Sequence, residues 1–522
     1  MRLALLTLLA VVAVYTVPGA AAPAGSLDSQ IRAVAALRGE PHRVGAAGLT
    51  PSDAAILTLE NGAAFDRSAT PRRLVIIGGL DENARSTQTV LELVRWLKTS
   101  APARTRAAWM VSALPAAAFD SADTLSLERW ITFQAPDVLL EVRDDGKTIG
   151  LASIRSVVVT SDRTPPAIER ILAAAPAGRS TLRDAIDRRV ERSPLEVARL
   201  LAGRYPETPT ISYIPAVAWT STLRLSAVLG DASLADAVKR QTAPWVSGGR
   251  PLFGERVQLT SVAGTMVFAD LGGDAARLAA EGARLASRRK DSGIAEYGQG
   301  WTDDMFMASA VLSRAGELDT AAGLLSDYAS RLQRKDGVFV HATDGPFAWG
   351  RGNGFAALGL MELLTVMPES HPARAGLLAI FRRHMAGVRA WQSPDGMWRE
   401  VVDEPGAYRE ETATAMLMTA MARGLRLGWL DSTYAPVVEQ AWRALAAHVR
   451  DDGTVVDVCT GTGVGPTKRY YLDRAALTGA DDRGGAMALL AAMEIVALHK
   501  LDKLDRLDRL DRLDRLDERY RR

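Results

Sequence analysis

The stretch from Val338 to Phe355 reads VFVHATDGPFAWGRGNGF and gathers polar and aromatic side chains among glycines. His341 is one of only 6 histidines in 522 residues, and Trp349 and Arg351 flank Gly350. Glycine lets a backbone approach a ligand closely, an aromatic ring stacks on a sugar face, and an arginine forks onto a carboxylate. The stretch therefore predicts the wall of a pocket for an anionic, ring-shaped ligand. The alternative is a glycine turn with a core tryptophan and a surface arginine.

A short motif that begins just before this stretch recurs along the chain. Asp336-Gly337 leads into an extended run, and the same pattern starts at Asp395-Gly396 and Asp452-Gly453, at intervals of 59 and 57 residues. Such an interval fits two helices and their loops, and Asp291-Ser292-Gly293 fits an altered earlier copy. Helix pairs that repeat in this way form a solenoid or close into a toroid. We expect the repeated loops, gathered at one end, to carry the function.

Residues from about 191 onward have the pattern of helices. Apolar side chains recur there at three- and four-residue spacing, the periodicity of an amphipathic helix. The clearest segments are 278–286, 305–315, 355–366, 412–425 and 437–449. We expect an all-α domain over residues 191–499.

Several motifs in this region resemble, in the same order, those of unsaturated rhamnogalacturonyl hydrolases and the similar unsaturated glucuronyl hydrolases. They are WTDDMFM at 301–307, WGRGNGF at 349–355, GMW at 396–398, YREETATAM at 408–416, GWLD at 428–431, VCTGTG at 458–463 and GGA at 484–486. The resemblance covers roughly residues 260–495. It implies an (α/α)6 barrel of six helical hairpins and the removal of a terminal 4,5-unsaturated uronic acid from an oligosaccharide.

The resemblance also implies roles for individual side chains. Asp303 stands at the catalytic position, where it would protonate the double bond and then act as the base for water. Arg351 would bind the uronate carboxylate, and Trp349 and Phe355 would stack on its ring. His341 would hydrogen-bond near the reacting carbon or the water. The alternatives are a helix N-cap for Asp303 and a satisfied core position for His341.

Trp398, in the second copy of the repeated motif, is a further candidate for substrate binding. Trp391, Glu410 and Glu411 are candidates for the same end of the barrel. The two glutamates could equally begin a helix, where the helix dipole stabilises an acidic side chain.

One position departs from the family pattern. Members of the family carry a second aspartate five residues before a glycine, and aligning that glycine with Gly264 puts Leu259 in its place. No acidic residue lies between Glu255 and Asp270. A second interpretation therefore stands beside the first: a catalytically silent barrel that binds glycans.

Residues 27–190 alternate strand-like and helix-like stretches, which predicts a parallel α/β sheet. The expected strands are 74–77, 107–114, 138–142 and 157–159, and 86–97 is an expected helix. The loop from Gly78 to Ser86, together with Glu141 and Arg143, resembles the core of zinc carboxypeptidases. Gly79 stands where their zinc-binding histidine would be, so the resemblance implies a degenerate domain. We expect neither a metal nor a cofactor.

Composition excludes two other classes. Hydrophobic residues make up 48% of the chain and charged residues 24%, as in a soluble globular protein. A net charge of +2, without a basic run among aromatics, argues against nucleic-acid binding. Cys459 is the only cysteine, which excludes an intrachain disulfide and a cysteine-based zinc site.

The two ends of the chain have biased sequences. Residues 1–22 combine a charged start, an apolar run and a small-residue AAA, which predicts a secretory signal peptide. The apolar run is shorter than the roughly 20 residues of a membrane span. We therefore expect a mature chain that lacks a membrane span and is exported, either periplasmic or secreted. In the charged tail at 500–522, residues 501–515 repeat Leu-Asp-Arg or Leu-Asp-Lys with a three-residue period, which predicts a charged exposed helix or a disordered extension.

Overall fold

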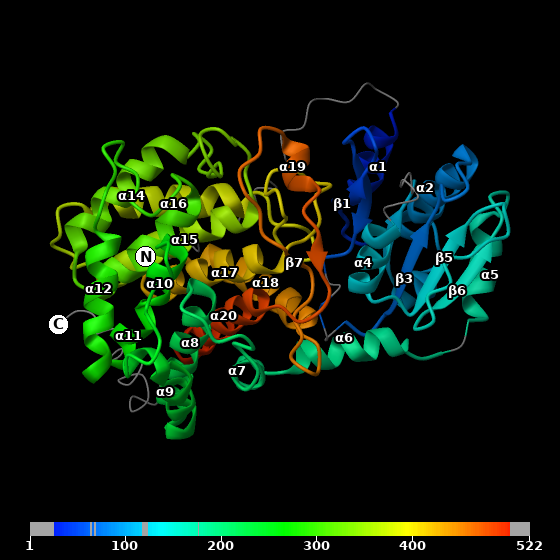
Figure 1. Cartoon of the computed structure of the whole chain (residues 1–522). Coiled ribbons are helices and arrows are strands. Elements are labelled where there is room, and N and C mark those ends of the chain that lie inside the picture. The colour runs from blue at the N-terminus through cyan, green and yellow to red at the C-terminus, as the bar shows by residue number, and fades with distance from the viewer. Residues whose placement is uncertain (1–25, 63–64, 67–68, 117–123, 176, 502–522) are drawn as a thin grey trace, which may run out of the picture.

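The computed structural model describes residues 26–62, 65–66, 69–116, 124–175 and 177–501. The expected signal peptide at 1–22 and nearly all of the expected tail lie outside the described residues. Figure 1 shows an α/β part, blue to cyan, beside a larger helical part, green to red. The expected order, an α/β region followed by a helical region, is confirmed. Among the described residues, no helix is long and apolar enough to cross a membrane.

Six strands form the sheet of the α/β part: β1 (Arg43–Leu49), β2 (Ala55–Glu60), β3 (Arg72–Ile77), β4 (Trp109–Leu114), β5 (Val138–Val142) and β6 (Arg155–Val159). Their order across the sheet is β1-β2-β4-β3-β5-β6. The four strands from β4 to β6 in this order run parallel, as expected. The sequence did not predict β1 and β2, which form an antiparallel hairpin that joins the sheet through β4.

The helices of this part are α1 (Leu27–Ala35), α2 (Ala84–Thr99), α3 (Ala103–Ala108), α4 (Thr124–Gln134), α5 (Pro165–Ala173) and α6 (Thr181–Glu191). Helix α2 covers the expected segment, and the side chain of Asn83 caps it by accepting from the N–H of Arg85. Ala107 and Ala108 were expected in a strand but end α3. The segment ARTRAA is rich in good helix formers, and the strand begins only at Trp109.

The helical part begins at Pro194, three residues after α6 ends. Its main helices are α7 (Pro194–Ala202), α8 (Tyr213–Leu229), α9 (Ala232–Val246), α10 (Leu259–Gly264), α11 (Met266–Leu271), α12 (Ala276–Ala286), α13 (Thr302–Arg314), α14 (Leu318–Leu332), α15 (Gly350–Val366), α16 (Arg374–Arg389), α17 (Glu411–Arg426), α18 (Ala435–His448) and α20 (Asp482–Leu501). Short elements complete it: 3-10 turns at Gly273–Ala275 and Ser432–Tyr434, strands β7 (Val458–Cys459) and β8 (Ala476–Leu477), and helix α19 (Lys468–Leu472). All five segments predicted to be helical are confirmed.

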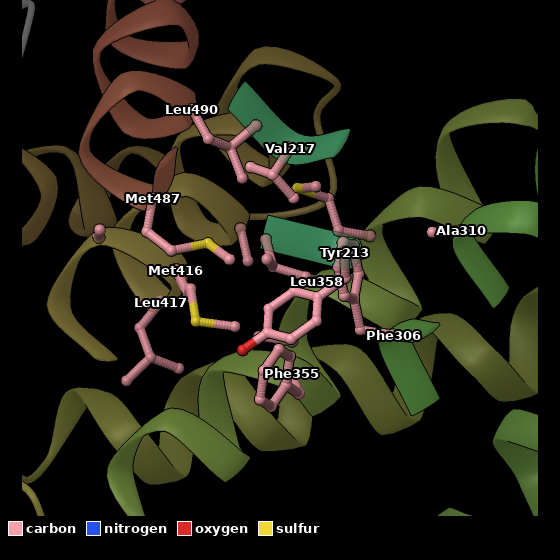
Figure 2. Packing of buried hydrophobic residues seen from close by; sticks show 14 of the residues in the cluster. Tyr213, Val217, Phe306, Ala310, Phe355, Leu358, Met416, Leu417, Met487 and Leu490 are labelled. Carbon is pink, nitrogen blue, oxygen red and sulfur yellow. The ribbon is translucent and has the colours of Figure 1, made fainter. Parts of the chain in front are cut away.

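The central helices pack in a closed succession. Helix α13 contacts α15, α15 contacts α17, α17 contacts α20, and α20 contacts α8, which reaches α13 again through α10 and α11. Figure 2 shows the core between them, with Tyr213 and Val217 from α8, Phe306 and Ala310 from α13, Phe355 and Leu358 from α15, Met416 and Leu417 from α17, and Met487 and Leu490 from α20. This apolar core fixes the positions at which the loops leave the helices.

The repeated Asp-Gly motif folds into one recurring turn. Its glycine takes a left-handed φ of +93° at Gly337, +104° at Gly396 and +83° at Gly453, and Gly293 of the altered copy has +79°. In each copy a backbone N–H donates to the carbonyl four residues later and so closes the turn. In the copy at Gly337, the N–H of Arg334 donates to the carbonyl of Val338 at 2.9 Å. The repeat is therefore structural, and each copy follows one of α12, α14, α16 and α18.

The glycine-rich stretch after Trp349 does not form the glycine turn of the alternative interpretation. Residues from Gly350 onward form the first turns of α15, with no left-handed φ. A Cβ on Gly350 would lie 2.2 Å from the carbonyl oxygen of Arg399, and one on Gly354 would lie 2.8 Å from Met416. These glycines therefore allow α15 to pack closely against its neighbours.

Candidate active site

Asp303 and His341 meet at the amino end of α13. Nε2 of His341 lies 3.2 Å from Oδ2 of Asp303, and Nδ1 lies 3.1 Å from the hydroxyl of Tyr471. The imidazole is fully buried, whereas the Asp303 side chain is 18% exposed. The N–H of Gly465 donates to the Tyr471 oxygen, which leaves the hydroxyl proton for Nδ1. A neutral imidazole then carries its proton on Nε2 and donates it to Asp303.

Aromatic rings surround this imidazole. The ring centroids of Trp349, Trp301 and Tyr471 lie 4.6, 5.2 and 5.6 Å from that of His341. Burial raises the pKa of Tyr471 to about 12, so its hydroxyl remains a donor at neutral pH. Apolar surroundings strengthen the hydrogen bonds that His341 makes.

Asp303 lies on the wall of a cavity of about 510 Å³, within the usual range of roughly 300–1,000 Å³ for ligand pockets. Trp301 and Met307 line it beside Asp303, and Leu259, at the start of α10, lines it as well. The other lining residues are Arg256, Val257, Gln258, Thr260, Lys290, Glu296, Tyr297, Gly298, Gln299 and Asp304. The position aligned with the second family aspartate therefore lies in the same cavity as Asp303, with an apolar side chain.

Asp304, next to the candidate catalytic residue, has a structural role. Its Oδ2 accepts from the N–H of Gln299 at 2.9 Å, from the N–H of Gly300 at 2.7 Å and from the hydroxyl of Tyr328 at 2.7 Å. Burial raises the pKa of Asp304 to about 6, although these donors oppose the shift. Asp304 therefore holds the loop that leads into α13.

Arg351 is almost fully buried in the first turn of α15. Its Nε donates to Oγ1 of Thr412 at 2.8 Å, and Nη2 donates to the carbonyl of Cys459 and lies 3.6 Å from Oε1 of Glu410. Burial would lower the pKa of Arg351, but Cys459 and Glu410 together raise it, so the guanidinium stays charged. Nη1 makes no hydrogen bond to any described residue and faces Gly461, where a Cβ would lie 3.8 Å away.

Trp349 lies between the Asp303–His341 pair and Arg351. Its ring lies 4.6 Å from His341 and 5.7 Å from the guanidinium carbon of Arg351. A chain of contacts therefore joins Asp303, His341, Trp349 and Arg351, and of these four Asp303 lines the cavity.

Phe355 and Trp398 lie inside the packing instead. Phe355 has no exposed surface and contacts the rings of Tyr213 and Phe306 at 5.5 and 6.0 Å. Trp398 is also fully buried, and its Nε1 donates to the carbonyl of Val388 at 2.7 Å. A substrate contact by either ring, as predicted, would require the ring to be uncovered.

Sequence reasoning missed a buried carboxyl group beside Trp349. Oε1 of Glu400 accepts from Nε1 of Trp349 at 3.0 Å and from Sγ of Cys459 at 3.1 Å. Burial, followed by the charge of Glu410, raises the pKa of Glu400 to about 8. Burial also raises the pKa of Glu411 well above its usual value, and neither of its carboxyl oxygens has a hydrogen-bond partner among the described residues.

Metal chemistry has no candidate ligand set among the described residues. In the N-terminal domain, Gly79 and Glu82 follow β3 with φ values of +72° and +57°. Asp81 accepts there from the N–H of Asp144 at 2.7 Å, so the acidic loop is tied to its neighbours. The resemblance of this domain to zinc carboxypeptidases stays a prediction.

Residues 294–499, in the C-terminal part of the chain, match the family model of Glycosyl Hydrolase Family 88. An unsaturated 3S-rhamnoglycuronyl hydrolase of Alteromonas sp. (strain LOR) is 28% identical over 175 residues, covering 30% of this chain and 42% of the relative. Unsaturated rhamnogalacturonyl hydrolase YesR of Bacillus subtilis (strain 168) is 25% identical over 181 residues, covering 32% and 51%. The chain thus spans about half the length of the curated relatives it matches.

Solved structures agree on the fold. A possible member of the GH105 family from Salmonella enterica matches with a TM-score of 0.52 and 19% identity, covering 59% of this chain and 94% of that one. One from Klebsiella pneumoniae matches with a TM-score of 0.52 and 18% identity, covering 63% and 97%. At these identities the likeness shows the fold alone, and it supports the fold type expected for the helical part.

Proposed function

We propose that this protein is a glycoside hydrolase that removes a terminal 4,5-unsaturated uronic acid from oligosaccharides. The observation that carries the proposal is the 3.2 Å contact between Asp303 and His341 on the wall of the cavity. A partly covered aspartic acid that is oriented by a histidine is the group that acid-catalysed hydration of a vinyl ether needs. The unsaturated uronides in the names of the two hydrolases support this substrate class.

The proposed reaction uses one carboxyl group twice. Asp303 gives its proton to C4 of the C4=C5 double bond, and a water adds its oxygen to C5 while returning a proton to the Asp303 carboxylate. The product is a hemiketal, which opens and releases the rest of the oligosaccharide. His341 donates to Oδ2 and so leaves Oδ1 of Asp303 to carry the transferred proton.

Arg351 would hold the substrate carboxylate through Nη1 alone. Its Nε and Nη2 are already bound to Thr412 and Cys459, so a forked grip by these two nitrogens would break existing bonds. A single charged hydrogen bond fixes position with less directional constraint than a forked pair. Trp301 would cover the sugar at Asp303, where it already lines the cavity.

Three further parts of the proposal concern the whole chain. The closed succession of central helices supports an (α/α)6 barrel of six hairpins. The sequence of residues 1–22 supports export, and Gly79, at the position of the zinc-binding histidine, supports a degenerate N-terminal domain.

The test follows the double bond of the substrate. Wild-type protein and Asp303→Asn are incubated with several 4,5-unsaturated galacturonyl or glucuronyl disaccharides, and the loss of ultraviolet absorbance is recorded. The wild type should consume at least one substrate, and Asp303→Asn should be slower by about 10²–10⁴, the range for loss of a general acid. Equal inertness of both proteins on all substrates would rule the proposal out.

A catalytically silent, glycan-binding barrel is the second candidate. The observation that favours it is Leu259, which lines the cavity where a second acidic residue was expected and is 3% exposed. Calorimetric binding of the same disaccharides to wild-type protein, without any loss of their absorbance, would identify this function.

A further inference from the structure

We propose that the N-terminal α/β domain positions Arg351 in the active site, because it forms ion pairs with both of the loops that hydrogen-bond to Arg351. The role of Arg351 in binding substrate rests on the function proposed above, whereas the positioning of the two loops by the N-terminal domain does not. The first, residues 409–412, is the loop end that runs into α17 and contains Thr412; the second, residues 457–459, is the loop end that runs into β7 and contains Cys459. Both Thr412 and Cys459 accept hydrogen bonds from Arg351. In Figure 1 the N-terminal domain faces this end of the helical part, with α4 beside β7.

The first grip is an ion pair between Glu60 and Arg409. Glu60 ends strand β2, and its two oxygens lie 2.7 and 2.8 Å from Nη2 of Arg409. Trp130 and Thr58 of the same domain also donate to Glu60, at 3.0 and 2.7 Å. Glu60 is 1% exposed, so solvent screens this pair little.

Arg409 stands directly before the residues that hold the arginine of the site. Glu410 accepts from the N–H groups of Thr412 and Cys459, at 3.1 and 2.9 Å. Thr412 in turn accepts from Nε of Arg351. A shift of Arg409 would therefore pass through one peptide unit to Glu410, which joins the two loops.

The second grip acts on the other loop. Nε of Arg129, in helix α4, lies 2.9 Å from Oδ1 of Asp457. Asp457 has a left-handed φ of +62°, an uncommon conformation that aspartate adopts more readily than most non-glycine residues. Its carbonyl accepts from the N–H of Glu411 at 3.0 Å, and Cys459 follows two residues later. Fixing Asp457 thus fixes both the start of α17 and the carbonyl that Arg351 binds.

Apolar packing also holds the N-terminal domain against the helical part. Phe133, also in α4, stacks on His448 with ring centroids 3.6 Å apart. One buried cluster combines Phe65, Phe133, Ala135 and Ile186 with Met397, Ala444, Ala447 and Val456 of the helical part. The burial of this apolar surface stabilises the contact between the two parts and so keeps the partners of the two ion pairs close to each other.

The single cysteine gives a readout that does not depend on catalysis. Cys459 is fully buried and is the only thiol in the chain, so a thiol reagent modifies it only when the loop at 457–459 opens. Glu60→Gln loses a buried charged hydrogen bond and Arg129→Gln loses a close ion pair, so each should raise the rate of its modification in native buffer by at least about tenfold.

Asp137→Asn is the matched control, because it also turns a buried carboxylate of this domain into an amide. The partners of Asp137 are Arg73, Ser180 and Arg183, all in the N-terminal domain. The modification rate in Asp137→Asn should stay within about twofold of the wild type, at a temperature at which all variants keep their native circular dichroism. Equal rates in wild type, Glu60→Gln and Arg129→Gln would overturn the proposal, as would an equal rise in Asp137→Asn.

Enzyme kinetics then test whether the two ion pairs affect the proposed reaction. With an unsaturated disaccharide, Glu60→Gln and Arg129→Gln should raise KM by about tenfold and change kcat by less than about threefold, because they misplace a binding group rather than the acid. An unchanged KM beside a faster cysteine reaction would overturn the link to binding. If the wild type proves inert, the cysteine rates still decide whether the domain positions the loops.

Discussion

Nε2 of His341 lies 3.2 Å from Oδ2 of Asp303, and this contact joins two residues that are 38 positions apart in the sequence. Asp303 sits in the first turn of α13, and His341 lies between the turn at Gly337 and helix α15. The backbone repeats the connection, since the N–H of Thr302 donates to the carbonyl of His341 at 3.0 Å. The pair is therefore fixed by neighbouring helix ends, and its chemistry depends on which nitrogen of His341 carries the proton.

Tyr471→Phe should lower kcat by about five- to tenfold, because it removes the hydrogen bond that sets the tautomer of His341 and is worth about 1 kcal/mol. KM should remain within about twofold, because the hydroxyl does not contact the cavity. Initial rates on an unsaturated disaccharide measure both constants.

Tyr470→Phe is the control for this variant, because the adjacent ring packs on Arg474 and makes no contact with His341. Its kcat should equal that of the wild type. A wild-type kcat in Tyr471→Phe would show that Tyr471 does not set the proton position.

Helices were predictable from the sequence because their signal is local. Apolar side chains at three- and four-residue spacing identified five segments, and all five are helical. Strands β1 and β2 gave a weaker signal. The first reads RVGAAGL, in which small residues and two glycines carry little strand preference, and it is stabilised by its pairing with β2.

The site was predictable only where its residues belong to motifs. Asp303, His341, Trp349 and Arg351 were found because each stands in such a stretch. Tyr471 and Glu400 were not, since their partners lie 130 and 51 residues away and only the closing of the helices brings them together. The burial of Phe355 and Trp398 depends on the same packing and has no local signature.

Gly350→Ala should lower the free energy of unfolding by about 1–3 kcal/mol, the usual cost of overpacking a buried site. The new Cβ would lie 2.2 Å from the carbonyl oxygen of Arg399, a backbone atom that cannot rotate away. Gly376→Ala, inside α16 with no atom within 4 Å of the new Cβ, should instead stabilise by about 0.5–1 kcal/mol. Urea unfolding measures both, and opposite signs are the expected result. A stabilising Gly350→Ala would contradict the close approach of α15.

Trp398→Phe should destabilise the fold and leave substrate affinity unchanged. The variant loses the 2.7 Å bond from Nε1 to the carbonyl of Val388 and leaves a small void, together about 1–3 kcal/mol. Urea unfolding gives the stability, and the KM for an unsaturated disaccharide gives the affinity. A severalfold rise in KM without loss of stability would show instead that Trp398 binds substrate, as the sequence predicted.

Glu400 should make the stability of the protein fall as pH rises. Its pKa is about 8 in the folded state, because of burial and then of Glu410, against 4.5 for an ordinary glutamate. Below pH 4.5 the group is protonated in both states and its full contribution is present. As pH rises toward 8 the unfolded chain ionises first, so this contribution to the free energy of unfolding is lost.

Glu400→Gln should remove this dependence, because the amide keeps an acceptor for Nε1 of Trp349 and does not ionise. The stability of the variant relative to wild type should increase by at least about 2 kcal/mol between pH 5 and pH 8, measured by urea unfolding at each pH. Glu196→Gln, at an exposed helix start where hydrogen bonds to Ser193 lower the pKa of the carboxyl, should keep the wild-type slope over this range. If Glu400→Gln also keeps that slope, Glu400 is ionised in the folded protein, and its carboxyl does not have the raised pKa that burial implies.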